Sequence, residues 1–354
     1  MERHGRFIQR SWTILGVTFL NTKVIFDGTA PTLTVYEAFQ NIVSRRTEDL
    51  RRIATGGSGI LPAGALSYEL VNRLTEETCK VARHVLHMAI RALDYCPAVD
   101  ITFGEYLRAL ITADIDIMPD DRYGYRVAFM EAFRNRGILP RNVRTISQES
   151  LAWDTPDKPK PDWMKDLLRE IDVRWNRRLQ RSDVFSLNEK NRAIARKVLK
   201  AACLKDQGLY LHFGLDQGVP RYDQNGKVMH KVNAGDTTFD VASIRPVRRV
   251  ASDGTFRTDI NVVIQQRKRE LVDPNDPEGS WFWFRGGATL IIDAREGYEE
   301  VRYAIVKSSG SRARLDRQRQ LNAGGQGSAL SSLYFGESKG EPFAMMHAFG
   351  GGNG

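Results

Sequence analysis

The stretch TFRTDINVVI, Thr255–Ile264, decides the fold class of this 354-residue chain. Its apolar and polar side chains alternate with a period of two, which is the pattern of a β-strand with one buried face. One face is expected to carry Phe256, Thr258, Ile260, Val262 and Ile264, and the other Arg257, Asp259 and Asn261. Because the chain before this stretch has helical periodicity, the sequence predicts an α+β protein with a mainly antiparallel sheet.

Three more strands are expected around the quoted stretch. The expected set is Ala242–Val250, the quoted stretch, Trp281–Asp293 and Glu299–Lys307. Asp253-Gly254 is a hairpin signal between the first two, and the last two are joined through Glu296-Gly297. Antiparallel strands of this length form a sheet with one face that needs cover. We expect helices over residues 187–206 and 311–322 to supply that cover.

Helical signals dominate residues 35–153. A long helix is expected from Ser67 to Leu93, and Thr102–Glu105 forms a capping box that opens the next helix. A third helix runs from about Arg122 to Arg136, with Gly137 as its C-terminal glycine. A second capping box, Ser186–Glu189, is expected to start a later helix.

A proline-rich segment supplies the clearest domain boundary. DTPDKPKPDW holds three prolines in ten residues, which excludes regular structure. The expected organisation is a poorly defined segment 1–34, a helical domain 35–153, a linker 154–163, helices plus the antiparallel sheet over 164–322, and a loose Gly/Ser-rich tail 323–354.

Composition narrows the function classes. No window holds 18 uninterrupted apolar residues, so no membrane span is expected. Cys79, Cys96 and Cys203 lack CxxC spacing and are expected to be free thiols of a cytoplasmic protein. Net charge is +9, but 43 acidic residues are interspersed with the 52 basic ones, so nucleic acid is not the expected partner. The densest basic stretches, expected to be solvated faces, are RPVRRV (245–250), QQRKRE (265–270) and SRARLDRQRQ (311–320).

His84 and His87 lie in the long helix, in CKVARHVLHMAI. A zinc peptidase helix needs His-Glu-x-x-His, with the two ligands four positions apart and a glutamate as general base. Here the spacing is three, and Val85 and Met88 stand where the glutamate and second ligand belong. His84 is expected at the border of the buried stripe and His87 in solvent. We therefore predict no catalytic residue, no metal ligand and no cofactor.

The run WFWFRGG, Trp281–Gly287, contains the candidate contact residues Trp281, Trp283 and Arg285. The aromatic pair beside an arginine is able to stack a base or a peptide, and the alternative is packing in a core or against the helical domain. The Arg-Gly-Gly sequence is able to form an anion-binding bend, and the alternative is a bulge or sharp bend in the strand.

Two stretches resemble the C-terminal helical subdomain of thermolysin-like (gluzincin) metallopeptidases. They are RHVLHMAIRALDYCPAVDITFGEYLRALITADIDI, Arg83–Ile117, and YRVAFMEAFRNRGIL, Tyr125–Leu139. The phrases ATGGSGILPAGAL, VNRLTEET, VRTISQESLAW, FWFRGG and VRYAIVKSS also resemble bacterial gluzincin-like proteins in which a β-rich tail follows the peptidase-like part.

The resemblance implies a truncated or split peptidase-like protein. In the family the zinc-binding helices precede the matched region, and only about 34 residues precede it here. No catalytic residue is carried over, because no position matches the family's motif. Two hypotheses stay open. One is a remnant, inactive alone, completed by a separately encoded zinc-bearing half or by self-association, with Val35, Phe39 and Ile42 exposed. The other is a standalone module whose sheet binds protein or nucleic acid.

Overall fold

The computed structural model describes residues 30–61, 66–157, 160–172, 181–233, 235–250, 256–295 and 299–323. Within these residues the protein is of the α+β class, as expected, with a four-stranded and a two-stranded antiparallel sheet. The expected segments 1–34 and 323–354 fall largely outside the described residues, as do the turns at Asp253-Gly254 and Glu296-Gly297. None of the described helices is both long and apolar enough to cross a lipid bilayer.

The first half of the described chain is helical. Its elements are α2 (Ala30–Ala54), α3 (Tyr68–Ala92), a 3-10 turn (Leu93–Tyr95), α4 (Phe103–Ile115), α5 (Tyr125–Asn135) and α6 (Gln148–Leu151). The capping box at Thr102 and Glu105 is present, and Ser67 caps α3 as expected. Gly137 has a φ of +66° just after α5, where the Ile138 amide bonds back to Phe133. These local signals therefore placed the helix ends correctly.

Four more helices follow: α7 (Asp162–Glu170), α8 (Arg181–Lys205), α9 (Gly208–His212) and α10 (Arg312–Ala323). The expected helix start at Ser186 is wrong, because helical structure already runs from Arg181. The Asn188 side chain instead accepts a hydrogen bond from the Ile244 amide at 3.4 Å. Asn188, a residue of the expected capping box, therefore bonds to strand β3 and does not mark a helix start. Helix α7 begins inside the proline-rich segment, at Asp162.

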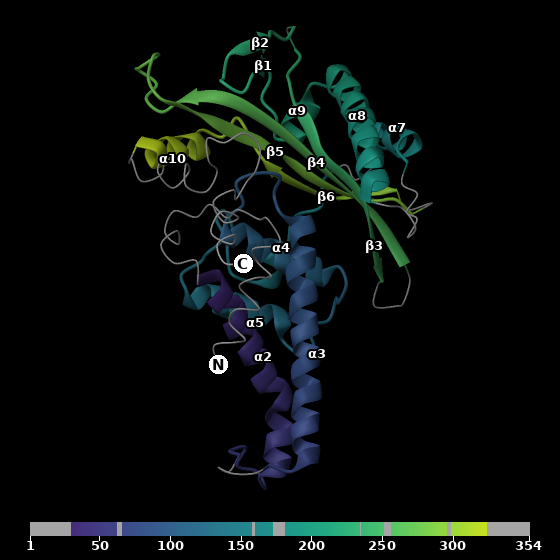
Figure 1. Ribbon diagram of the computed structural model, residues 1–354, viewed down its shortest axis with the longest axis vertical. Coiled ribbons are helices and arrows are strands. Elements are labelled where there is room, and N and C mark those ends of the chain that lie inside the picture. Colours follow the sequence, from purple (N-terminus) through teal and green to yellow (C-terminus); the bar gives the residue numbers. More distant parts are fainter. Residues whose placement is uncertain are drawn as a thin grey trace, which may run out of the picture.

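The main sheet has the strand order β3-β4-β5-β6. Its strands are β3 (Asp240–Val250), β4 (Phe256–Leu271), β5 (Trp281–Asp293) and β6 (Glu300–Lys307). The bounds are close to those expected except for β4, which continues seven residues past the expected end at Ile264. The small sheet pairs β1 (Arg221–Tyr222) with β2 (Val228–His230), a hairpin that the sequence interpretation missed. In Figure 1 the sheet lies between α7, α8 and α9 on one side and the α2–α5 region on the other.

The apolar face of the sheet has the expected composition. Ile260, Val262 and Ile264 are fully buried and pack with α7, α8 and α9. The side chains of Phe256 and Arg257 lie outside the described residues. Helix α8 supplies cover along β3 as expected. No residue of α10 is buried, but Arg314 lies over the Phe284 ring and Arg319 bonds to the Leu271 carbonyl, so the cover from 311–322 is made by polar side chains at the end of the sheet.

The polar face is buried as well, which the alternation did not indicate. Asn261 donates to the Asp94 carbonyl at 2.7 Å, and Gln265 donates to the Ala98 carbonyl at 2.7 Å. Asp259 is fully buried beside Arg302, 3.5 Å away. Asn261 and Gln265 of β4 thus donate hydrogen bonds to main-chain carbonyls that follow α3 instead of contacting water. Buried carbonyl groups need such donors.

The α2–α5 region has a closed core of its own. Val35 and Ile42 of α2 are buried, and Phe39 packs against the same cluster. The expected exposure of these three residues is therefore wrong: α2 packs along α3 and α5, and Ile291 and Ile305 of the sheet extend the cluster. Figure 1 shows α2 and α3 projecting together as a long pair from the body of the molecule.

Candidate functional site

Strands β4 and β5 run beyond their neighbours and form a two-stranded extension. Pairing of β3 with β4 ends at Gln265, and pairing of β6 with β5 ends at Gly287. Beyond these points Arg267 lies opposite Arg285 and Arg269 opposite Trp283. Since side chains two apart on a strand share a face, Trp281, Trp283 and Arg285 lie together on one face of this extension. We call it the arginine face, defined by Arg267, Arg269, Arg285, Trp281 and Trp283.

The two tryptophans pack against each other and under the β1–β2 hairpin. Their ring centroids are 5.1 Å apart, and Tyr222 meets Trp283 edge-on at 5.6 Å. A Cβ atom at Gly226 would lie 2.9 Å from the Trp281 ring, so the hairpin turn needs glycine there. Both indoles are half-buried. The packing alternative describes them best, but the cover is this hairpin and not the helical domain.

Arg267 and Arg269 lie over the indoles. The Arg267 guanidinium carbon is 4.5 Å from the centroid of Trp283, and that of Arg269 is 5.3 Å from Trp281. Both arginines and Arg285 are exposed. Within the described part of the chain, no carboxylate lies within 4.0 Å of any of the three. Arg267 and Arg285 are thus two like charges directly across a strand pair, an arrangement that destabilises a sheet.

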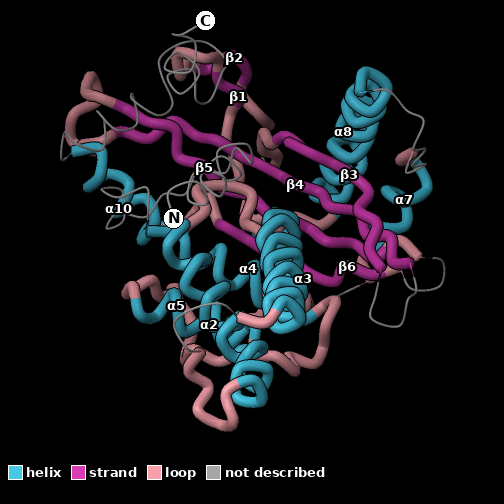
Figure 2. Tube along the Cα trace, turned by 60° about the horizontal axis from the view of Figure 1, so that its bottom comes forward, coloured by secondary structure: helices cyan, strands magenta, loops and turns pink. Residues whose placement is uncertain are grey.

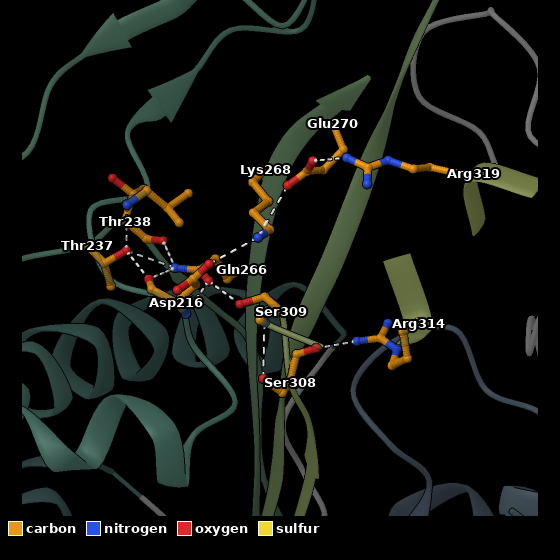
Figure 3. Close-up of polar contacts among 12 residues, drawn as sticks. Asp216, Thr237, Thr238, Gln266, Lys268, Glu270, Ser308, Ser309, Arg314 and Arg319 are labelled. Carbon is orange, nitrogen blue, oxygen red and sulfur yellow. Dashed lines mark hydrogen bonds and ion pairs between the residues drawn. The ribbon is translucent and has the colours of Figure 1, made fainter. Parts of the chain in front are cut away.

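The opposite face of the same extension is electrostatically balanced (Figure 3). Lys268 lies 3.0 Å from Asp216 and 3.3 Å from Glu270, and Arg319 of α10 pairs with Glu270 at 3.1 Å. Arg314 of α10 pairs with Asp100 at 2.9 Å. One face of the extension therefore neutralises its cations internally, while the arginine face does not.

A buried amide organises the base of the extension. Gln266 donates to the carbonyls of Asp216 and Thr238, at 2.9 and 3.1 Å, and accepts from Ser309 at 2.5 Å (Figure 3). The Ser309 backbone lies so near Gly286 that a Cβ there would be 2.3 Å from the Ser309 nitrogen. Register between β4 and β5 is unbroken at Gly286. The glycines after Arg285 thus permit close packing and form neither a bulge in this pairing nor an anion-binding bend.

The two histidines of α3 have separate environments. His84 Nε2 lies 3.2 Å from Asp114, and its ring is tilted against the Tyr125 ring with the centroids 4.2 Å apart. Asp114 is also 3.3 Å from Arg126. His87 is exposed. Both positions agree with the sequence interpretation. Among the residues with a described placement, no group of three or more His, Cys, Asp or Glu is arranged to hold a metal ion.

The sequence interpretation selected the tryptophans and Arg285 but missed Arg267 and Arg269, which it placed on a solvated face. Two signals were present. The Asn225-Gly226 turn marks the hairpin that covers the indoles. The length of β4, which continues to Leu271, brings Arg267 opposite Arg285.

Comparison with family models, curated proteins and solved structures finds no match to this chain.

Proposed function

We propose that this protein is a non-catalytic interaction module whose arginine face binds an acidic segment of another protein. The observation that carries the proposal is the set of three exposed guanidinium groups without a carboxylate partner among the described residues. Arg267 and Arg269 are held over indole rings, so less side-chain freedom is lost when they bind. Guanidinium forks match carboxylates in a bidentate geometry.

Protein is favoured over nucleic acid by the surroundings of the indoles. Bases stack on open aromatic faces, but Trp281 and Trp283 are half-buried and carry Arg269 and Arg267 on their rings. The turn that ends the extension carries three exposed acidic side chains: Asp273, Asp276 and Glu278. These charges lie within a few strand residues of the arginines and would repel any anionic ligand that continued past them, so they favour a short acidic segment over a long polyanion such as a nucleic acid.

The test is binding of a fluorescent oligoglutamate peptide, measured by anisotropy at several salt concentrations. The double variant Arg267→Gln and Arg285→Gln is expected to bind about 10-fold more weakly. Each lost ion pair contributes up to about 1 kcal/mol to binding, and a loss of about 1.4 kcal/mol corresponds to a 10-fold change in affinity. The matched control is Arg52→Gln with Arg169→Gln, two exposed arginines elsewhere with the same change in net charge. Equal weakening by both double variants, or binding of a single-stranded oligonucleotide in preference to the peptide, would contradict the proposal.

A second candidate function is that of a split peptidase-like protein. It is supported by the resemblance of Arg83–Leu139 to the gluzincin helical subdomain and by the exposed apolar side chains of α3 in that region, among them Leu86 and Ile90. A separately encoded half with His-Glu-x-x-His would then bind here. Co-expression with such a neighbouring protein is expected to yield a complex with about one zinc per pair. The chain alone is expected to hold no stoichiometric zinc, because the described residues contain no group of three or more His, Cys, Asp or Glu placed to hold a metal ion.

A further inference from the structure

Helix α3 has a continuous uncharged row on its outer surface. Seven exposed positions form it: Tyr68, Val71, Thr75, Cys79, Ala82, Leu86 and Ile90. Their spacing is three, four and four residues, repeated twice, an average period of about 3.67 that stays on one side of a nearly straight helix. The row is about 33 Å long at 1.5 Å per residue. Figures 1 and 2 show α3 beside α2 in the helical region.

The exposure of this row is unusual for large apolar side chains. Tyr68 is 77% exposed, Leu86 50%, Ile90 45% and Val71 43%. The buried side of the same helix is already complete, with Val81, Val85 and Met88 packed in the core. Helix α3 therefore has a second apolar row in addition to its buried side. Such a row is typical of a helix that packs against another helix.

The row is symmetric about Cys79. Tyr68 and Ile90 are each eleven residues from Cys79, Val71 and Leu86 are eight and seven residues away, and Thr75 and Ala82 four and three. Large side chains therefore lie at both ends and small ones at the centre. If two copies of α3 cross antiparallel at Cys79, large side chains meet large ones, and the small central residues let the helices approach closely.

A shallow groove lies beside the first half of the row. Its volume is about 280 Å³, and it is lined by Leu66, Val71, Leu74, Thr75, Thr78 and Cys79. Positions i, i+3, i+4 and i+7 are the four residues that receive a side chain of a facing helix. In the antiparallel arrangement with Cys79 opposite Cys79, Arg83 and His84 of the second copy lie at the level of the groove centre.

Charges along the flank of the row favour the antiparallel direction. Glu69 and Glu76 lie in the first half of α3, and Lys80, Arg83 and Arg91 in the second half. Arg73 is the exception, and it pairs with Glu76 of its own helix at 3.4 Å. Antiparallel packing brings Glu76 beside Arg83 of the second copy on both sides of the two-fold axis, whereas parallel packing sets the charged flank of one helix against the uncharged flank of the other, which carries Leu74 and Thr78.

We infer that a second copy of this chain binds along α3, forming a two-fold homodimer with antiparallel helices centred on Cys79. A strip about 33 Å long and about 10 Å wide covers about 330 Å² on each copy, below the roughly 800 Å² of a standard interface. The dimer is therefore expected to dissociate on dilution, and sedimentation should show a concentration-dependent approach to twice the 40.1 kDa mass of the chain.

The decisive variant is Ala82→Arg. Ala82 is exposed and arginine is a good helix former, so the monomer stays folded, as circular dichroism will check. Two unpaired charges at the crossing are expected to weaken the dimer by about 100-fold. The matched control is Ala201→Arg, an exposed alanine on α8, which should leave association unchanged. A chain that is monomeric at every concentration, or a dimer that Ala82→Arg leaves intact, overturns the inference.

Two further measurements test register and direction. A short bismaleimide should join two copies through Cys79, because Cys96 and Cys203 are buried, and Cys79→Ser should abolish the product. Glu76→Arg and Arg83→Glu should each weaken association, and the double variant should restore it. Failure of the double variant to restore association, or a cross-linked product that persists in Cys79→Ser, contradicts the antiparallel register. Capture of a zinc-bearing peptidase half by a chain that stays monomeric would assign α3 to that partner instead.

Discussion

The Asn261 side chain on β4 donates a hydrogen bond of 2.7 Å to the main-chain carbonyl of Asp94, beside α3. Asn261 is 2% exposed, so this bond lies at a dry contact between the sheet and the helical region. Gln265, four residues along β4, makes the equivalent bond to Ala98. Two regions that the sequence pattern treated as separate domains are therefore joined through the polar face of the sheet.

Asn261→Leu is expected to lower the free energy of unfolding by about 1–3 kcal/mol, because the Asp94 carbonyl loses its donor in a buried position. Urea denaturation followed by circular dichroism measures the change. Asn275→Leu, in the exposed turn after β4, serves as the control and should have little effect. An unfolding midpoint for Asn261→Leu equal to that of the unmodified protein would show that the contact does not stabilise the fold.

Gly286→Ala is expected to cost about 3 kcal/mol or more, since an added Cβ would lie 2.3 Å from the Ser309 nitrogen and 2.6 Å from its Cα. Backbone atoms cannot rotate away as a flexible side chain does. The comparison is Gly310→Ala, where the nearest atom would be the Ser308 hydroxyl at 3.5 Å. Thermal unfolding of the two variants should differ widely, and similar melting temperatures would rule out the close approach.

Glu77→Gln is expected to reduce the dependence of stability on acid pH. Hydrogen bonds from Lys80 and then Arg46 lower the pKa of Glu77 below its ordinary value of 4.5. The unfolded chain therefore binds the proton at higher pH than the folded chain, so this contribution is present above pH 4.5 and is lost as the pH falls through the folded-state pKa. Chemical denaturation from neutral to acid pH measures it. The difference between Glu77→Gln and the unmodified protein should shrink as the pH drops, and a constant difference would contradict the assignment.

Limited proteolysis is expected to cut first within residues 154–161. Asp154, Thr155 and Asp157 are exposed, whereas Trp153 donates to the Tyr95 carbonyl at 3.0 Å and Trp163 is buried. Because the sheet packs against the helical region, the two fragments should remain together in gel filtration after the cut. An earlier cut within 100–140, or fragments that separate at once, would require a different account of how the two regions are held.

Local patterns in the sequence determined most of the helices, the four main strands and one face of the sheet, but not the β1–β2 hairpin or the full length of β4. Alternation over Thr255–Ile264 placed Ile260, Val262 and Ile264 on the apolar face, and the capping box at Thr102 marked the start of α4. These signals work because period and capping depend on residues within a few positions of each other. The position of His84 at the edge of the buried stripe of α3 followed for the same reason.

Only the tertiary structure decided that the polar face of the sheet is buried and which residues make up the arginine face. The carbonyl that accepts from Asn261 lies 167 positions earlier in the chain, so no local pattern separates this buried side chain from a solvated one. Arg267 faces Arg285 only through the register of β4 with β5, and the indoles are covered only because a hairpin from residues 221–230 folds over them. Alternation shows that two faces differ, but what packs against each face depends on contacts between distant segments.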